Sequence, residues 1–334
     1  MLPLTLPILR LLADGEFHSG EHIAAQLGVS RASICNALQD SAFLGVHLHK
    51  IRGRGYQLST PIEWLELEQI YAHSGNQGAK IPIQILDVVE STNTLLMQTA
   101  AQNSNASRCV VAEIQTQGRG RRGRVWHATL GGSLTFSVLW QFNVGVSQLS
   151  GLSLAVGVAL ARALTEIGIP DIQLKWPNDL MHGYHKLGGV LIELQGDALG
   201  PSTTVIGVGL NIRLPEVVKN RIDQAVVDVF SLKPEGVSRN QLLGITLGHL
   251  QNIFIEFETH GFGRMRDEWQ KLHAYQSKSV ALRMPDGAEV LGVVRGVSTE
   301  GALILETSSG ERRFGSGEIS MRAAAQLNPL LKRA

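Results

Sequence analysis

Four arginines and three glycines share the seven positions Gly118–Arg124. Glycine lets the backbone approach a ligand closely, and an arginine fork grips carboxylate or phosphate oxygens in pairs. Four like charges in one loop repel one another, so we expect this loop to stay mobile until an anion enters. An exposed surface loop or a nucleic-acid patch has the same composition, and this segment alone leaves all three possibilities open.

A second polar cluster runs Lys175-Trp-Pro-Asn-Asp179 and resumes at Lys186-Leu-Gly-Gly189. We expect Lys175 at a strand end, a turn at 177–179, and Lys186 at the start of the next strand. A lysine at a strand mouth can stabilise a transferring phosphoryl group as a point charge, and Asp179 could orient it or hold a metal. The alternative is a surface hairpin whose lysine protects a sheet edge.

A third segment, Glu90-Ser-Thr-Asn93, precedes an apolar run and is typical of a helix N-cap. Hydroxyl and amide groups at a helix start also suit a small polar head such as a urea or a carboxylate. The cap is expected whether or not the segment binds a ligand.

In this order, the segments closely resemble the motifs of the biotin–protein ligases. The match includes Gln115–Trp126 around the loop and continues with Gly207-Val-Gly-Leu-Asn211 and Gly317-Glu-Ile-Ser320. Gly15–Glu21 and Leu27–Ala32 are similar to the winged helix of the biotin operon repressor subtype. The resemblance covers nearly the whole chain, and the ordered set is far more specific than any one motif.

The resemblance implies roles for the residues that match. Lys186 and Arg121 are implied as catalytic residues, and Trp126 is expected to pack near the loop. The implied biotin-binding residues are Ser91, Thr92, Asn93, Gln115, Arg119, Gly120, Arg121 and Lys186. The implied nucleotide-binding residues are Arg119, Arg121, Asp179 and Asn211.

The implied reaction is two in-line displacements, with ATP and biotin as substrates and Mg²⁺ offsetting phosphate charge. Biotin carboxylate attacks the α-phosphate to give biotinyl-adenylate, and a lysine of the biotin carboxyl carrier protein then attacks the mixed anhydride. No chain residue is assigned to the metal. We expect a large rate loss for Lys186→Ala and for Arg121→Ala, and a smaller one for Arg124→Ala.

The elements expected around these motifs form an α/β (α+β) catalytic domain with a mixed or antiparallel sheet. One helix is expected before the first strand, at 63–71, and a second after it, from Ser91 or Thr92 to Ala101. Later helices are expected at 149–167, 239–259 and 264–272. The expected strands are 81–88, 109–114, 133–140 (with alternation), 172–176, 188–194 and 203–212.

Short strands separated by Gly-containing turns then predict an SH3-like β-barrel. The expected domains are 1–60, a winged helix-turn-helix; 61–80, a connector; 81–275, the catalytic domain; and 276–325, the barrel.

Within the first domain, helices are expected at 7–13, from Ser19 and from Ser30, followed by a two-stranded wing (46–51 and 56–58). The second helix of such a motif enters the DNA major groove. The residues expected to contact DNA are Ser30, Arg31, Ser33, Asn36, Arg52 and Arg54. A winged helix kept for protein contacts is the alternative.

The overall composition gives no sign of a nucleic-acid or membrane partner. The net charge is only +1, so binding to DNA or to a membrane would require a local cluster of basic residues. The two cysteines lie in apolar stretches and are expected to be buried, reduced thiols, as in a reducing cytoplasm. The apolar N-terminus lacks a basic n-region, and no signal peptide or membrane span is expected.

Four hypotheses remain. The first is a cytoplasmic biotin ligase that, as a homodimer with biotinyl-adenylate bound, also represses biotin genes through operator DNA. The second is a ligase without DNA regulation. The third is a lipoate or octanoate ligase, which a long, wholly apolar channel would favour. The fourth is a ligand-sensing transcription factor, against which the Arg121 and Lys186 cations argue.

Overall fold

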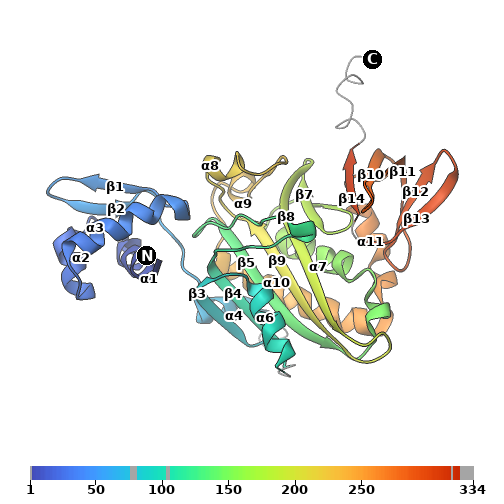
Figure 1. The fold of residues 1–334 in the computed structure, drawn as a ribbon, viewed down its shortest axis with the longest axis horizontal. Helices are drawn as coiled ribbons and strands as arrows, with labels where there is room; N and C mark the ends of the chain where they lie inside the picture. Colours follow the sequence, from blue (N-terminus) through green and yellow to red (C-terminus); the bar gives the residue numbers. More distant parts are fainter. Residues whose placement is uncertain (1, 76–80, 103–105, 317–318, 324–334) are drawn as a thin grey trace, which may run out of the picture.

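The computed structural model describes residues 2–75, 81–102, 106–316 and 319–323. Three units follow one another along the molecule: an N-terminal helical unit with a hairpin, a central seven-stranded sheet with helices, and a five-stranded C-terminal sheet (Figure 1). The expected mixed α/β centre with an N-terminal helix-turn-helix and an all-β C-terminus is confirmed.

The N-terminal unit has the expected helix-turn-helix and wing. Its elements are α1 (Leu2–Leu11), α2 (Gly20–Leu27), α3 (Arg31–Gln39), β1 (Leu48–Ile51) and β2 (Gly55–Leu58). Ser19 accepts a hydrogen bond from His22 N and Ser30 accepts one from Ser33 N, so both hydroxyls cap helices as expected. The first helix begins earlier than expected, at Leu2, with Pro7 inside it.

The central sheet has the strand order β3-β4-β5-β9-β8-β7-β6. Only β3 and β4 are parallel among its described pairs, which confirms a mixed sheet. The bounds are β3 (Ile83–Val89), β4 (Arg108–Gln115), β5 (Ser133–Phe142), β6 (Gln173–Lys175), β7 (Asp179–His182), β8 (His185–Gly196) and β9 (Ser202–Asn211).

Two strand predictions need correction. The segment after Asp179 is strand β7, which makes a hairpin with β8, and only three residues separate it from β6. The strand from Ser133 is buried along most of its length rather than alternately exposed, because helices or loops cover both of its faces.

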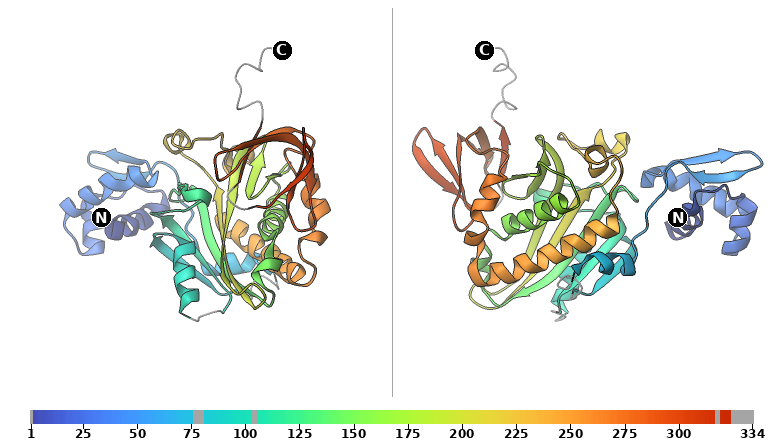
Figure 2. Two further views of the ribbon diagram at one scale, coloured as in Figure 1. Left: turned by 45° about the vertical axis from the view of Figure 1, so that its right-hand side comes forward. Right: turned by 180° about the vertical axis from the view of Figure 1, so that it is seen from behind.

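Helices α7 (Leu152–Glu166) and α10 (Arg239–His260) cover one face of the sheet, and Figure 2 shows them side by side from behind. The helix α4 (Leu67–His73) packs on α10 and starts four residues later than expected, after the extended residue Glu66. Helix α6 (Thr92–Ala101) contacts β4, β5 and β9. Short helices α8 (Glu216–Lys219), α9 (Val229–Leu232) and α11 (Arg266–Lys271) complete the unit.

The C-terminal sheet is antiparallel, with the order β13-β12-β11-β10-β14. Its strands are β10 (Ser279–Arg283), β11 (Glu289–Val297), β12 (Leu303–Thr307), β13 (Gly310–Phe314) and β14 (Ser320–Ala323). The last strand was not expected from the sequence. Gly317 and Glu318 of the matched motif, part of the expected connector (76–80) and the end of the expected barrel (324–325) lie outside the described residues.

Both terminal units pack on the central one. Ile114 of β4, with Trp64 and Leu130, joins the apolar core of the N-terminal unit, and Leu130 N donates to Leu44 O at 3.1 Å. On the other side, Trp176 Nε1 donates to Gly301 O at 3.1 Å. In the described part of the chain, no helix has the length and apolar character needed to span a membrane.

Candidate active site

A cavity of about 740 Å³ lies over the ends of β4, β5, β8 and β9. Three segments border it: the arginine–glycine loop Gly118–Arg124, the loop 221–226 after α8, and the C-terminal unit through Ile319, Met321 and Arg322. All the residues with an implied biotin or nucleotide role line this cavity. The structure therefore brings together motifs that are more than 100 residues apart.

The start of α6 forms one polar end of the cavity. Ser91 caps the helix, accepting from Thr94 N at 3.4 Å. Thr92 donates through N and Oγ1 to Gln115 Oε1 at 2.8 and 3.1 Å, which joins the helix to the end of β4. All three lie in the cavity wall, and Ser91 and Thr92 are buried. Buried hydroxyls with fixed partners can present donors and acceptors to a small polar head.

Asn93 is bonded to protein groups through both atoms of its amide. Its amide nitrogen donates to Leu191 O and Glu193 Oε2, and its oxygen accepts from Ser137 Oγ at 2.6 Å. A Cβ on Gly207 would lie 2.1 Å from Asn93 Oδ1, so only glycine leaves room for this amide. Asn93 therefore shapes the cavity floor, and its implied contact with biotin stays a prediction.

A cluster of charges forms the other end. Lys186 Nζ lies 2.6 Å from Asp179 Oδ1, and Lys175 Nζ lies 3.7 Å from Asp179 Oδ2. Burial opposes the charge of Asp179, but both lysines offset this and hold the pKa of its carboxyl below the usual value. Burial, with Lys186 and Arg124 nearby, lowers the pKa of Lys175. One carboxylate thus faces several cations, an arrangement that favours an additional anion.

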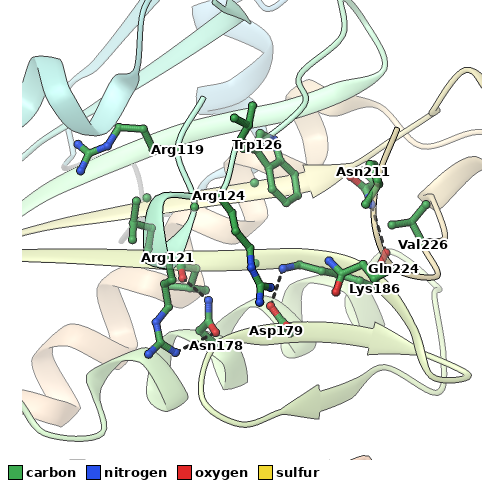
Figure 3. A pocket seen from close by; sticks show the side chains of 18 of the residues that line it. Arg119, Arg121, Arg124, Trp126, Asn178, Asp179, Lys186, Asn211, Gln224 and Val226 are labelled. Atoms are coloured by element: carbon green, nitrogen blue, oxygen red, sulfur yellow. Dashed lines mark hydrogen bonds and ion pairs between the residues drawn. The ribbon is translucent and has the colours of Figure 1, made fainter. Parts of the chain in front are cut away.

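Arg119, Arg121 and Arg124 of the loop point in different directions (Figure 3). Arg119 pairs with Glu193, with an Nη2–Oε1 distance of 2.8 Å. Arg121 donates to Asn178 Oδ1 at 3.2 Å and to Ser316 O at 2.5 Å, which ties the loop to the C-terminal unit. Arg124 extends to the Lys186–Asp179 pair and acts on the charge of Asp179.

Trp126 and Asn211 support the walls. The ring of Trp126 covers Gly209, where a Cβ would lie 2.5 Å from the indole, so the expected packing beside the loop is present. Asn211 Nδ2 donates to Lys186 O at 3.2 Å and to Val227 O at 3.1 Å. Its implied nucleotide contact stays a prediction, and its observed contacts fix the backbone of Lys186 beside the 221–226 loop.

Sequence reasoning missed several residues at this site. The matched motifs imply no specific role for Lys175, and they predict a smaller loss for Arg124→Ala than for Arg121→Ala. Glu193, Ser137 and the loop 221–226 carried no recognisable pattern. Their partners lie tens of residues away in the chain, so spacing alone contained no signal for them.

The residues expected to contact DNA lie on the N-terminal unit. Ser30, Arg31 and Asn36 are exposed at α3, and Arg52 and Arg54 are exposed at the wing, whereas Ser33 is half-buried and bonded to Ser30. The Arg54 guanidinium lies 4.2 Å from the centre of the Phe17 ring, and Arg31 lies 3.6 Å from Glu21. Cys109 is buried as expected, but Cys35 of α3 is only half-buried.

Comparisons with known proteins agree with this architecture. Residues 85–211 match the biotin/lipoate A/B protein ligase family, residues 278–322 match the biotin protein ligase C-terminal domain, and residues 5–57 match a helix-turn-helix domain. Among solved structures, the biotin protein ligase from Aquifex aeolicus in complex with biotin and ATP is similar, at 27% identity and a TM-score of 0.61. That match covers 73% of this chain and 99% of the other.

Two curated relatives match over nearly their full length. The bifunctional ligase/repressor BirA of Salmonella typhimurium is 36% identical, over 97% of this chain and 98% of the relative. The protein of the same name from Escherichia coli is 34% identical, over 96% and 97%. The chain therefore belongs to the biotin–protein ligase family, among the bifunctional ligase/repressors that carry an N-terminal helix-turn-helix domain.

Proposed function

We propose that this chain activates biotin with ATP to biotinyl-5'-AMP and transfers biotin to a lysine of a biotin carboxyl carrier protein. The observation that carries the proposal is the cavity itself. It has a buried polar end at the start of α6 and a cationic end at Lys175, Lys186 and Arg124. A molecule with a polar ring and a carboxylate to be adenylated requires both ends.

The first step forms a bond between the biotin carboxylate oxygen and the α-phosphorus, and pyrophosphate leaves. In this proposal Lys186, held by Asp179, stabilises the negative charge that builds on the phosphoryl oxygens, and Arg124, which extends to the same ion pair, assists it. Such fixed cations stabilise the transition state more than the ground state. Asp179 is better placed to position Lys186 than to bind nucleotide, because both of its oxygens contact lysines.

In the second step, the carrier's lysine amine attacks the acyl carbon, the acyl–phosphate bond breaks, and AMP leaves. The loop Gly118–Arg124 borders the cavity, and its closure would limit the access of water to the anhydride. The contacts of Arg121 with Asn178 and Ser316 favour a role in closing this loop.

Mg²⁺ would enter with the ATP phosphates. Among the described residues, no group of three acidic, histidine or cysteine side chains is placed to hold a metal ion. Magnesium is commonly bound through substrate phosphates and water with few protein ligands. The exposed Asp223 is an acidic side chain that lines the cavity.

A second proposed activity is repression of biotin genes by a homodimer that binds operator DNA when biotinyl-adenylate is present. Its support is the exposed basic wing and the exposed start of α3. The proposal also includes the domain boundaries expected from the sequence, at residues 60, 80 and 275.

The test is one assay with ATP, an apo carrier domain, and either biotin or lipoate. We expect pyrophosphate release and carrier labelling with biotin, and little of either with lipoate, because the cavity end at Ser91 and Thr92 is polar. If lipoate were used as well as biotin or better, the proposed substrate would be wrong. A complete lack of biotin binding by calorimetry, with and without nucleotide, would overturn the enzyme assignment.

A further inference from the structure

Glu193 is a carboxylate outside the implied site residues, and it lies where three parts of the site meet. It belongs to β8, and its side chain is 23% exposed. Its Oε2 accepts from Asn93 Nδ2 at 2.9 Å, and its Oε1 accepts from Arg119 Nη2 at 2.8 Å. One side chain therefore joins the first turn of α6 to the arginine–glycine loop.

The two partners of Glu193 differ in their freedom to move. Asn93 is 4% exposed and is also bonded to Leu191 O and Ser137 Oγ. Arg119 is 47% exposed and lies on the loop, where it also donates to Thr94 Oγ1 at 3.2 Å. The buried Asn93 thus fixes the Glu193 carboxylate on the cavity floor. The carboxylate can in turn restrain Arg119 and, with it, the loop.

The position of Arg119 affects the whole loop. Arg119 pairs with Val125 in a β-bridge, and Gly120 N donates to Arg124 O at 2.8 Å, so the loop is a tight hairpin. Fixing one end of such a hairpin also orients Arg121 and Arg124 over the cavity. A partly exposed ion pair contributes little to global stability, but it is large enough to shift the opening of a local loop severalfold.

We propose that Glu193 is a positioning residue that holds the arginine–glycine loop closed over the acyl adenylate. The inference rests on the proposed function and deepens it, because it names the group that retains the intermediate. Without the ion pair the loop opens more often and water reaches the anhydride. Water oxygen then bonds to the acyl carbon, the acyl–phosphate oxygen bond breaks, and AMP leaves with the electron pair while biotin is regenerated.

Glu193→Gln is the variant of choice, because glutamine keeps an acceptor for Asn93 but removes the charge that binds Arg119. The measurement is the number of AMP molecules formed per biotin attached to the carrier, with kcat and KM for biotin determined separately. We expect a ratio near one for the wild type and about two- to fivefold more for Glu193→Gln. Arg119→Gln should also raise the ratio, and the double variant should not exceed the higher single variant.

Glu268→Gln is the matched control. It breaks the two-bonded Arg162–Glu268 pair, which has similar exposure and lies between α7 and α11, away from the cavity. Its ratio should equal that of the wild type. A Glu193→Gln ratio equal to that of Glu268→Gln would overturn the inference, even if melting temperature or kcat fell, because a purely structural role predicts that pattern.

If Glu193→Gln fails to fold, Glu193→Asp keeps the charge but shortens its reach by one methylene and should raise the ratio less steeply. A wild-type ratio for a folded Glu193→Asp would then overturn the inference. Failure of the wild type to form any AMP from ATP and biotin is a different result, since it removes the proposed function and not the loop contact.

Discussion

Lys186 is the residue on which the proposed chemistry depends most. Its ammonium group is fixed 2.6 Å from the carboxylate of Asp179 and lines the cavity. We expect Lys186→Ala to lower single-turnover pyrophosphate release by about 10²–10³-fold, the usual cost of removing one transition-state donor. Folding should be retained, because Lys175 still faces Asp179. The exposed Lys271→Ala is the control, and a Lys186→Ala rate within a few-fold of that control would reject the catalytic role.

The ranking of Arg121 and Arg124 is a second prediction at this scale. The sequence favours a larger loss for Arg121→Ala, whereas the geometry favours Arg124→Ala for the chemical step, because Arg124 extends to the Lys186–Asp179 pair. Arg121 instead contacts Asn178 and Ser316. We expect Arg124→Ala to lower the adenylation rate more and Arg121→Ala to lower the yield of labelled carrier per AMP more. Pre-steady-state adenylation and transfer measurements separate the two, and a slower adenylation step in Arg121→Ala would restore the original ranking.

At the scale of elements, a buried ion pair joins β4 to α10 and to the segment before α4. Arg239 and Glu113 are each 1% exposed, and their Nη2–Oε2 distance is 2.8 Å. Arg239 also donates to Glu63 O, and Glu113 accepts from Leu65 N. Because Glu113 lies two residues before Gln115, this network fixes the strand end that reaches the site.

We expect Glu113→Gln to reduce the free energy of unfolding by about 3–5 kcal/mol, because it leaves a buried guanidinium without its counter-ion. The partly exposed pair in Glu268→Gln should cost less than about 1 kcal/mol. Urea denaturation of both variants tests this. If both variants lost the same free energy of unfolding, burial of the Glu113–Arg239 pair would not make it more important for stability, which would contradict the prediction.

His273, just after α11, gives a pH-dependent prediction. It is 5% exposed and packs on Trp269 with ring centroids 4.5 Å apart, and burial lowers its pKa from 6.5 to about 4. Between these values the unfolded chain binds a proton that the folded chain does not, so stability falls as the pH drops from 6.5 toward 4. Wild type should lose up to about 3 kcal/mol relative to His273→Leu over this range. Thermal melts across pH 4–8 measure it, and a stability difference that is constant with pH would contradict the prediction.

At the scale of the whole molecule, the basic wing lies at the end opposite the C-terminal sheet (Figure 1). Arg52 and Arg54 are exposed there, and phosphate contacts weaken with salt. For operator DNA we expect Arg52→Ala/Arg54→Ala to weaken binding and to reduce the slope of log affinity against log salt by about 2. Adenylation should stay within about twofold of wild type, because neither residue lines the cavity.

The control double variant is Arg283→Ala/Arg312→Ala, which removes two exposed arginines from the C-terminal sheet. It should leave the salt slope unchanged. Titrations at several salt concentrations distinguish the outcomes, and wild-type binding that does not depend on salt would remove the repressor role.

Local sequence determined much of this protein. Three helix caps were predicted because each depends only on nearby residues. In each, the serine hydroxyl accepts a hydrogen bond from the backbone N–H three residues later, at Ser19, Ser30 and Ser91. The ordered motifs predicted the family and the residues that line the cavity for the same reason, since each motif is a short turn or strand end. Two elements show where prediction from local sequence fails. The helix expected at 63–71 starts only at Leu67, after the extended residue Glu66. Strand β7 was missed because it is defined by the pairing of Asp179 with Lys175 and Gly189, which belong to the neighbouring strands.

The tertiary structure alone decided which charges meet. Glu193 faces Arg119 across 74 residues, and Arg121 reaches Ser316 across 195, because the strand order and the path of the loop bring them together. It also decided that Arg124 extends toward the Lys186–Asp179 pair, whereas Arg121 contacts Asn178 and Ser316. Neighbouring arginines in a tight loop point in different directions, and their directions depend on backbone angles and on partners that no spacing rule encodes.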